Sequence, residues 1–268
     1  MVTVETLAKD DLLTINSVKP HDWHDLTPIH SMYLDSEICY PFKVVTKGEM
    51  AGIGTAIVYG DTAWLAHIIV GERFRKSGIG SAIVEHLLGF LDSRHRVETI
   101  TLTATDMGYP LYLRHGFETQ SEYVIYVTET SPQDLSDASQ VKPAQQSHLD
   151  EMKILDAEGS GEMRYPLLKN YADDSFVYAP DGQFLGYYIP GFGEGPIIAK
   201  TEQAGIELLK LKIRTCQRVV APAENAAAAD FLLEQGYSVQ KRIPRMIRGR
   251  SFTWRPEWNY SRIGGYAG

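Results

Sequence analysis

The segment Ile68–Ser81, which reads IIVGERFRKSGIGS, decides the fold prediction. An apolar run ends at Val70, the basic residues Arg73, Arg75 and Lys76 follow, and two glycines then open a helical pattern. The first turn of a helix leaves backbone N–H groups unpaired at the positive end of its dipole. Glycine lets an anion approach those groups closely, because it has no Cβ. We therefore interpret the segment as a site for a diphosphate.

Two common phosphate-binding motifs do not match this segment. A Walker A loop has glycine directly before its Lys-Ser pair, whereas Arg75 precedes Lys76-Ser77 here. The dinucleotide fingerprint places its glycines directly after a strand, whereas seven residues separate Val70 from Gly78. A P-loop nucleotide hydrolase remains an alternative, and tight binding of ATP would support it.

The spacing that remains is Val70, four residues, Arg75, two residues, Gly78, one residue and Gly80. It resembles the acetyl-CoA motif of the GCN5-related N-acetyltransferases, the GNAT family. A second segment, Tyr112–Phe117 (YLRHGF), resembles the Tyr-x-x-x-Gly-Phe segment on the last helix of that family. The two motifs occur in the family's order, with a predicted strand between them.

The resemblance implies a set of coenzyme A contacts and a proton donor. In the family, the loop and the helix start surround the pyrophosphate, and the preceding strand pairs with the pantetheine arm. The tyrosine hydroxyl protonates the leaving thiolate, which assigns that role to Tyr112, and a backbone N–H of the preceding strand meets the oxyanion. The implied contacts are Ile68, Ile69, Val70, Arg75, Lys76, Ser77, Gly78, Ile79, Gly80 and Ser81.

The general base is not fixed by the motifs. An amine must lose a proton to attack a thioester, so a base or a water chain leading to one is needed. His67, on the strand next to the motif, and Asp106, after the following strand, are the candidates. A histidine that is satisfied within the strand face is the competing interpretation of His67. His21 and His24 are spaced like metal ligands, but we predict no metal site.

These motifs predict an enzyme. We expect an acetyl-CoA-dependent N-acyltransferase that transfers an acetyl group to a primary amine of a small molecule or peptide, with acetyl-CoA as co-substrate. The alternative is an acyl-CoA-binding sensor module without turnover, in which Tyr112 only packs.

Periodicity around the motifs predicts an α/β (α+β) fold. The resemblance implies two tandem GNAT-like domains, each a mixed, mostly antiparallel sheet flanked by helices. A stretch rich in Ser, Asp, Gln and Pro follows residue 127 and predicts a linker. We place a catalytic domain at residues 1–130, the linker at 131–144 and a second domain at 145–268. The elements predicted in the first half are a hairpin of Met50–Tyr59 and Thr62–Val70 about Gly60-Asp61, a helix over Ser77–Ser93, a strand over Glu98–Ala104, a helix over Pro110–His115 and a strand over Tyr123–Val127.

The second half repeats the pattern without the motifs. Phe231–Tyr237 (FLLEQGY) resembles Leu111–Phe117 (LYLRHGF), which favours a tandem duplication. The strand Pro196–Ala199 runs almost directly into a helix, without a basic loop or a Gly-x-Gly, and Leu232 stands opposite Tyr112. We therefore predict that this domain lacks the coenzyme A motif. Further elements are predicted over Thr201–Lys212 (helix), Arg218–Ala221 (strand) and Ala226–Gln235 (helix).

Composition excludes several other classes of protein. The 268 residues include 26 Lys and Arg against 34 Asp and Glu, a formal net charge of −8, which disfavours nucleic acid as a partner. Two cysteines exclude a disulfide scaffold, and no apolar run is long enough to span a membrane. The start of the sequence has no signal-peptide pattern. We expect a cytoplasmic protein that is a monomer or a homodimer, with neither nucleic-acid nor membrane partners.

Overall fold

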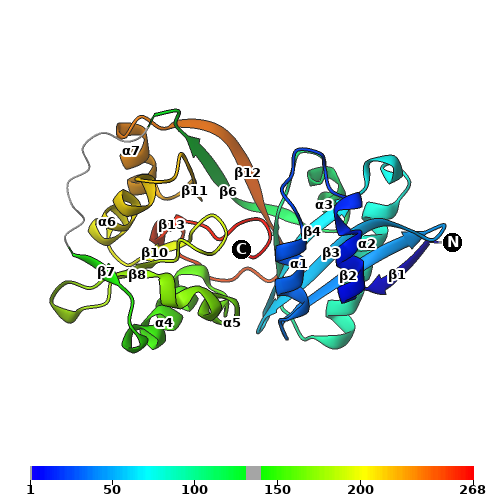
Figure 1. Cartoon of the computed structure of the whole chain (residues 1–268), viewed down its shortest axis with the longest axis horizontal. Coiled ribbons are helices and arrows are strands. Elements are labelled where there is room, and N and C mark those ends of the chain that lie inside the picture. The colour runs from blue at the N-terminus through cyan, green and yellow to red at the C-terminus, as the bar shows by residue number, and fades with distance from the viewer. Residues whose placement is uncertain (1, 131–139) are drawn as a thin grey trace. The chain divides into compact units, whose positions relative to one another are not determined.

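The computed structural model describes residues 2–130 and 140–268, which divide into two units (Figure 1). Unit 1 contains the chain up to Glu118 together with Met246–Arg250 and Gly265–Ala267. Unit 2 contains Thr119–Arg245, Ser251–Gly264 and Gly268. The strand Tyr123–Val127, predicted to close the first domain, lies in unit 2.

The predicted linker differs from the structure where the two can be compared. Residues 131–139 of that linker lie outside the described residues. Its end instead forms strand β7 (Val141–Pro143), which pairs with β8 (Phe176–Tyr178). Polar composition predicted a loop here, but edge strands with one exposed side tolerate such residues and a proline.

Unit 1 is built on a sheet whose strands follow one another in sequence. The order is β1 (Val2–Thr6), β2 (Cys39–Thr46), β3 (Glu49–Tyr59), β4 (Thr62–Val70) and β5 (Thr99–Thr103), with residues 246–249 of β12 (Ser238–Gly249) beside β5. Strands β1 to β4 are antiparallel, and β5 runs parallel to β4. The predicted hairpin is confirmed, and Gly60 takes the left-handed conformation that its tight turn requires, with φ 81°.

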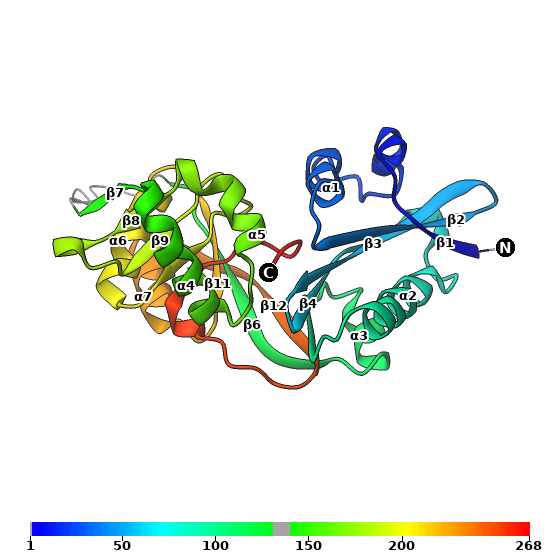
Figure 2. The ribbon, with the colours of Figure 1, turned by 90° about the horizontal axis from the view of Figure 1, so that it is seen from below.

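The helices of unit 1 cover both faces of this sheet (Figure 2). One face bears α1 (Thr27–Leu34), and the other bears α2 (Ile79–Arg94) and α3 (Tyr109–Arg114). Short 3-10 turns occur at η1 (Lys9–Leu13), η2 (Ile15–Ser17) and η3 (Glu72–Phe74).

Helix α2 lies unusually close to β3. A Cβ on Gly54 would collide with the side chain of Ile83, and one on Gly52 would lie 3.0 Å from the same side chain and 3.3 Å from that of Ile79. Two strand glycines thus fix the depth at which α2 packs, and with it the position of its N-terminus. The predicted strands and helices of this half are confirmed within a few residues of their ends, except that β6 (Glu118–Val127) begins five residues earlier.

Unit 2 contains an antiparallel sheet and part of a second sheet, in which β6 lies between β12 and β11 (Arg218–Pro222). The order of the antiparallel sheet is β13 (Asn259–Ser261), β10 (Ile197–Ala199), β9 (Gly186–Tyr188), β8 and β7. Strand β6 pairs with β11 in antiparallel register, and its pairing with β11 explains why it belongs to this unit. The helices are α4 (Leu149–Ser160), α5 (Tyr165–Leu168), α6 (Glu202–Ile213) and α7 (Ala226–Glu234), with 3-10 turns η4 (Gln146–His148), η5 (Lys169–Asp174), η6 (Pro180–Gly182) and η7 (Pro256–Trp258). The predicted fold class, mixed and mostly antiparallel sheets flanked by helices, is confirmed.

Candidate functional site

Strand β4 is bulged at His67. Ile69 lies opposite Ile53 and Ala66 lies opposite Thr55, so two residues of β4, His67 and Ile68, face a single residue of β3. His67 has φ 46°, in the left-handed region that a histidine seldom adopts. Such backbone strain is concentrated at functional sites.

Strand β4 also separates from β5. The parallel pairing covers Thr62–Trp64 only, so the later residues of β4 have no strand on that side within the described chain. The N–H of Gly71 donates to the carbonyl of Ala51 on β3, at 2.9 Å. Because backbone groups alternate in direction along a strand, the N–H and C=O of Val70 point to the open side. Val70 O accordingly accepts a hydrogen bond from Nε of Arg75, at 3.4 Å.

The glycine loop, residues 71–80, leads from β4 into α2. Lys76 and Gly78 adopt left-handed conformations, with φ 60° and 85°, and Gly78 is the residue that precedes the first turn of α2. Within the described residues no side chain caps this helix, and a Cβ on Gly78 would meet no atom within 4 Å. Unpaired N–H groups with open space in front of them suit a phosphate group.

Two of the three basic residues of the loop remain available to an anion. Arg75 keeps 30% of its side chain exposed and approaches Glu72 only at 3.9 Å. Lys76 is exposed and forms no ion pair with any residue in the described ranges. Arg73 instead pairs with Glu49 at 2.5 Å and stacks over the ring of Phe74. Arg73, which the sequence places beside Arg75 and Lys76, is thus directed towards Glu49.

The serine hydroxyls that the resemblance implied are engaged within the protein. Ser77 Oγ donates to the carbonyl of Phe74. Ser81 Oγ lies 3.1 Å from Oε1 of Glu85 and 2.9 Å from Nε2 of His115. Any contact of these residues with a phosphate would therefore come first from their backbone N–H groups.

The three predicted strand contacts face in different directions. Ile69 is buried with Ile15, Val18 and Leu26 on the α1 face of the sheet. Ile68 and Val70 pack with the core beneath α2, which also contains Ile79. A Cβ on Gly80 would lie 3.7 Å from the side chain of Val70, so the helix start and the open edge of β4 are neighbours.

Tyr112 lies on α3 and is 7% exposed. Its ring packs edge-on against Phe117, with centroids 5.9 Å apart, and a Cβ on Gly108 would approach it to 2.9 Å. Burial raises the pKa of Tyr112 to about 12, so the phenol stays protonated at neutral pH. No hydrogen bond joins its hydroxyl to another residue of the described chain.

The two candidate bases are in contrasting places. Asp106 is exposed in the turn before α3. His67 belongs to a group of aromatic side chains that we call the His67 cluster, which consists of Trp23, His30, Tyr33, His67 and Tyr266. The ring of His67 stacks on His30 at 5.0 Å and on Tyr266 at 5.8 Å between centroids.

Burial lowers the pKa of His67 to about 3, and the nearby His30 adds to the effect. Burial also lowers the pKa of His30 to about 4. Both rings are therefore neutral at pH 7, and each has one nitrogen that can accept a proton. His67 was predictable from the sequence as a candidate base. Tyr33 and Tyr266 were not, because no sequence pattern links residues so far apart in the chain.

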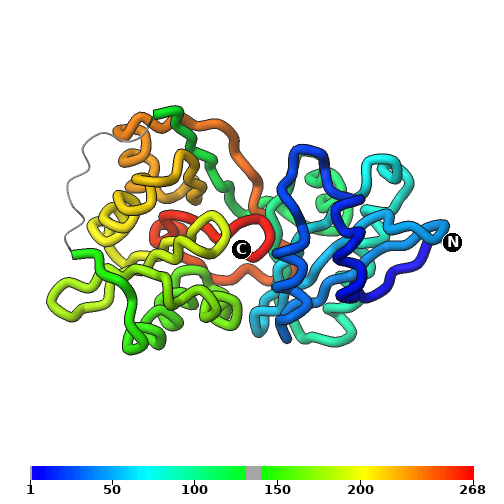
Figure 3. Tube along the Cα trace, in the orientation of Figure 1, coloured from blue at the N-terminus to red at the C-terminus, as the bar shows by residue number. Residues whose placement is uncertain are grey.

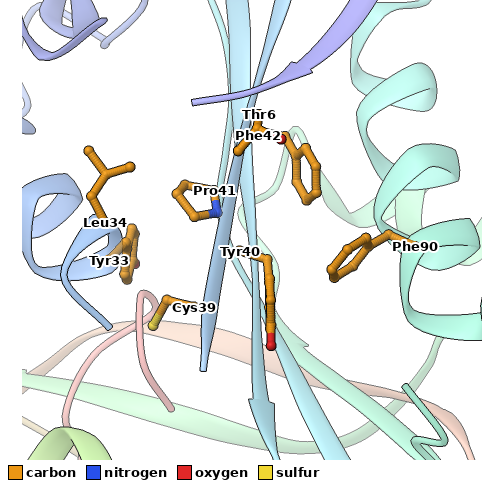
Figure 4. A pocket seen from close by; sticks show the side chains of 8 residues that line it. All are labelled: Thr6, Tyr33, Leu34, Cys39, Tyr40, Pro41, Phe42 and Phe90. Carbon is orange, nitrogen blue, oxygen red and sulfur yellow. The ribbon is translucent and has the colours of Figure 1, made fainter. Parts of the chain in front are cut away.

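A pocket of about 240 Å³ surrounds the edge of β2 (Figure 4). The pocket is lined mostly by aromatic and apolar side chains, those of Thr6, Tyr33, Leu34, Cys39, Tyr40, Pro41, Phe42 and Phe90. None of the predicted contacts at residues 68–81 is among these lining residues. Burial raises the pKa of its one thiol, that of Cys39, to about 11, which makes the thiol a poor nucleophile. This pocket offers no reactive group.

Residues 2–130 and 140–268 contain no group of three or more His, Cys, Asp or Glu side chains placed to hold a metal ion. His21 and His24 are both exposed. None of the helices in these ranges has the length and apolar character needed to cross a bilayer.

Comparison with known proteins gives a family for unit 1. Residues 7–117 match the family described as "Acetyltransferase (GNAT) family". This segment is a GNAT acetyltransferase domain. The match ends two residues before unit 2 begins at Thr119, so it lies entirely in unit 1. Members of the family use acetyl-CoA, which agrees with the open start of α2. No curated protein sequence matches the chain.

Solved structures extend the likeness of fold to the whole chain. A Pyrococcus horikoshii protein provisionally assigned as an acetyltransferase is 19% identical, with a TM-score of 0.85 over 100% of this chain and 96% of that one. A GCN5-related N-acetyltransferase from Sphaerobacter thermophilus is 13% identical, with a TM-score of 0.61 over 95% and 98% of the two chains. A GCN5-related N-acetyltransferase from Anabaena variabilis is also 13% identical, with a TM-score of 0.62 over 92% and 72%. The TM-scores show a shared fold, and at identities this low the likeness shows the fold alone.

Proposed function

We propose that unit 1 is an acetyl-CoA-dependent N-acetyltransferase that acetylates a primary amine of a small molecule or a peptide. The observation that supports this most directly is the start of α2. There the helix has no side-chain cap, a Cβ on Gly78 would meet nothing, and the open edge of β4 lies alongside. A diphosphate and an extended arm would both find unpaired backbone groups at this place.

The residues present fit coenzyme A. The N–H groups at Gly78, Ile79 and Gly80 would hold the diphosphate, with Arg75 and Lys76 adding positive charge. The backbone of Ile68–Val70 would pair with the pantetheine arm along the edge that β5 leaves free. Bound there, acetyl-CoA would supply the acetyl group as a thioester.

The protein's own groups then move two protons. His67 accepts the proton that the amine nitrogen loses once that nitrogen has bonded to the carbonyl carbon. The N–H of Val70, which points to the open side of β4, stabilises the negative charge on the carbonyl oxygen. Tyr112 donates a hydrogen bond, and finally a proton, to the sulfur as its bond to carbon breaks. One proton leaves nitrogen and one reaches sulfur, so the transfer is balanced.

The pKa values restrict how these groups act. Moving a proton from an ammonium of ordinary pKa near 10.4 to His67, whose pKa is about 3, would cost about 10 kcal/mol. The amine must therefore arrive neutral, and it becomes acidic enough for His67 only after it has bonded to carbon. We expect weakly basic amines, such as peptide α-amines, to react faster at pH 7 than lysine-like amines.

The test measures thiol release from acetyl-CoA across amines of graded basicity at fixed pH. Turnover that increases as the pKa of the amine falls supports the proposal. Tight binding of coenzyme A without release of thiol with any amine would contradict it and would favour an acyl-CoA-binding module.

A charge reversal tests the diphosphate site separately. Arg75→Glu replaces an attractive phosphate contact by a repulsive one, so we expect coenzyme A to bind at least ~2 kcal/mol more weakly. The control is Arg96→Glu, which changes net charge equally at an exposed residue beyond the far end of α2. Equal affinities of the two variants in calorimetry would show that the diphosphate binds elsewhere.

A further inference from the structure

The hydroxyl of Tyr33 lies between two groups that define its hydrogen bonding. It is 2.7 Å from the carbonyl oxygen of Tyr266 and 3.1 Å from Nδ1 of His67. The Tyr33 side chain is fully buried, and burial raises the pKa of its phenol far above the ordinary value, so the hydroxyl keeps its single proton.

That single proton decides the state of His67. A carbonyl oxygen can only accept, so the hydroxyl proton of Tyr33 is donated to Tyr266 O. The hydroxyl oxygen must then be the acceptor in its contact with His67, which requires a proton on Nδ1. Because the ring is neutral at pH 7, Nε2 is left without a proton and with its lone pair available.

The segment 265–267, coloured red in the trace of Figure 3, fixes the carbonyl to which the hydroxyl of Tyr33 donates its proton. Three consecutive carbonyls of this segment accept hydrogen bonds from buried aromatic side chains of unit 1. Trp64 Nε1 donates to Gly265 O at 3.1 Å, Tyr33 to Tyr266 O, and the Tyr59 hydroxyl to Ala267 O at 2.9 Å. The carbonyl of Tyr266 is thus held in place on both sides.

The neighbours of His67 leave Nε2 to a ligand. His30 on α1 donates from Nδ1 to the carbonyl of Leu26 at 2.9 Å, so this second imidazole stacks on His67 and does not hydrogen-bond to it. Trp23 and Tyr266 contact His67 through their rings. Across residues 2–130 and 140–268, no side chain or backbone group hydrogen-bonds to His67 Nε2, and part of the residue is exposed.

We propose that Tyr33, oriented by the carbonyl of Tyr266, is a positioning residue that holds His67 in the Nδ1–H tautomer and so keeps Nε2 as a proton acceptor. Free histidine favours the opposite tautomer, with the proton on Nε2. In that form the ring would present a donor to an incoming amine and could not take its proton. The catalytic consequence rests on the proposed acetyl transfer, whereas the tautomer itself does not.

The wild-type protein allows a direct test. Long-range ¹H–¹⁵N correlation spectra of histidine-labelled protein distinguish protonated from unprotonated ring nitrogens, and the His67→Asn spectrum identifies the resonances. We expect Nδ1 of His67 to be protonated and Nε2 to be bare at pH 7. A proton on Nε2 in the wild type would overturn the inference without any need for a variant.

Two matched variants test the role of Tyr33. Tyr33→Phe should release the ring into a mixture of tautomers and lower kcat at least tenfold, with the affinity for coenzyme A changed less than twofold. Tyr237→Phe removes another buried phenol hydroxyl that donates to a backbone carbonyl, that of Cys216 in unit 2, and it should leave the His67 spectrum and kcat nearly unchanged. An Nδ1–H tautomer that persists in Tyr33→Phe would overturn the assignment to Tyr33.

The failure of the proposed function would look different. If Tyr33→Phe shifts the tautomer while turnover stays the same, the positioning contact stands and His67 is not the base. Asparagine is the informative replacement for His67, because it tolerates the left-handed backbone and can still donate to Tyr33 while lacking Nε2. We expect His67→Asn to lower kcat at least 100-fold and to retain the wild-type fold.

Discussion

Helices α2 and α6 each follow a strand of their own unit, but they begin in different ways. Before α6, Thr201 accepts a hydrogen bond from the N–H of Ala204 at 3.2 Å, and the ring of Tyr260 covers Gly205 so closely that a Cβ there would collide with it. Before α2, a loop with two left-handed residues replaces the cap, and nothing lies over Gly78. One helix start is filled by the protein's own side chains, and the other is open.

The helices that come later, α3 and α7, end in the same way. Gly116 and Gly236 have φ values of 80° and 81°. The N–H of Phe117 bonds to Tyr112 O at 3.1 Å, and that of Tyr237 bonds to Leu232 O at 3.0 Å. The two units therefore share a local ending, and they differ where the resemblance places chemistry. Leu232 is fully buried and has no hydroxyl.

A strand-to-helix connection that is closed by a side-chain cap, as before α6, leaves no room for a ligand, whereas the uncapped start of α2 does. Thr201 and Tyr260 fill the start of α6, and the basic loop is missing before this helix, as the sequence indicates. We expect the contrast between the two units to appear in the following measurements, from the largest effect to the smallest.

The largest expected difference between the two units is in their stability at low pH. The pKa values of His67 and His30 are lowered to about 3 and 4, so folded unit 1 binds fewer protons than the unfolded chain below pH 6.5. Its stability is complete above pH 6.5 and falls as the pH falls towards 3, by on the order of 5 kcal/mol at pH 4. In unit 2 burial opposes ionisation of Glu194, but Arg262 and Arg218 outweigh it and lower its pKa, so that contribution is lost only below about pH 4.5.

Hydrogen exchange followed by mass spectrometry at pH 7, 5 and 4 would resolve the two units. Peptides of unit 1 should lose protection first, and His67→Asn should reduce the effect. Earlier opening of unit 2 would show that the buried histidines do not govern acid stability.

Closing the open start of α2 should have the next largest effect. Gly78→Asp places a carboxylate at the first turn, where it would satisfy the N–H groups and repel phosphate, so coenzyme A should bind at least 100-fold more weakly. Gly78→Asn has the same size and the same unfavourable positive φ without the charge, and it should weaken binding much less. Equal affinities of the two variants for coenzyme A in calorimetry would contradict the proposal that the uncapped start of α2 binds the diphosphate.

Removing the hydroxyl of Tyr112 makes α3 resemble α7. Tyr112→Phe should lower kcat at least tenfold and change the affinity for coenzyme A little, because the ring and its packing on Phe117 remain. Tyr109→Phe, on the same helix, is the control in the thiol-release assay. Undiminished turnover in Tyr112→Phe would remove the proton-donor assignment.

The smallest effect is expected in unit 2. Thr201→Ala removes the cap of α6 and should lower the stability of unit 2 by about 1 kcal/mol. Urea unfolding monitored by exchange in α6 would measure it, and coenzyme A affinity should be unchanged. A change in that affinity would mean that unit 2 also binds the ligand.

Local pattern was enough to predict most elements of the fold. Alternation and helical spacing placed β4, α2 and α3 within a few residues, because burial of one face imposes these periods on any sequence. The sequence did not reveal that β6 pairs with β11, because strand pairing depends on residues distant in the chain. It also gave no sign of the bulge at His67, which is a property of register and not of composition.

The sequence alone determined the chemistry available at the start of α2, since glycines, basic residues and their spacing act over a few residues. Tertiary structure decided which groups meet. Arg73 turned to Glu49, and Tyr33 came to bond a carbonyl 233 positions away, at Tyr266, and through that bond to orient His67. The physical reason is that a helix start is a local backbone property, whereas the protonation of a buried ring depends on every group that folding packs against it.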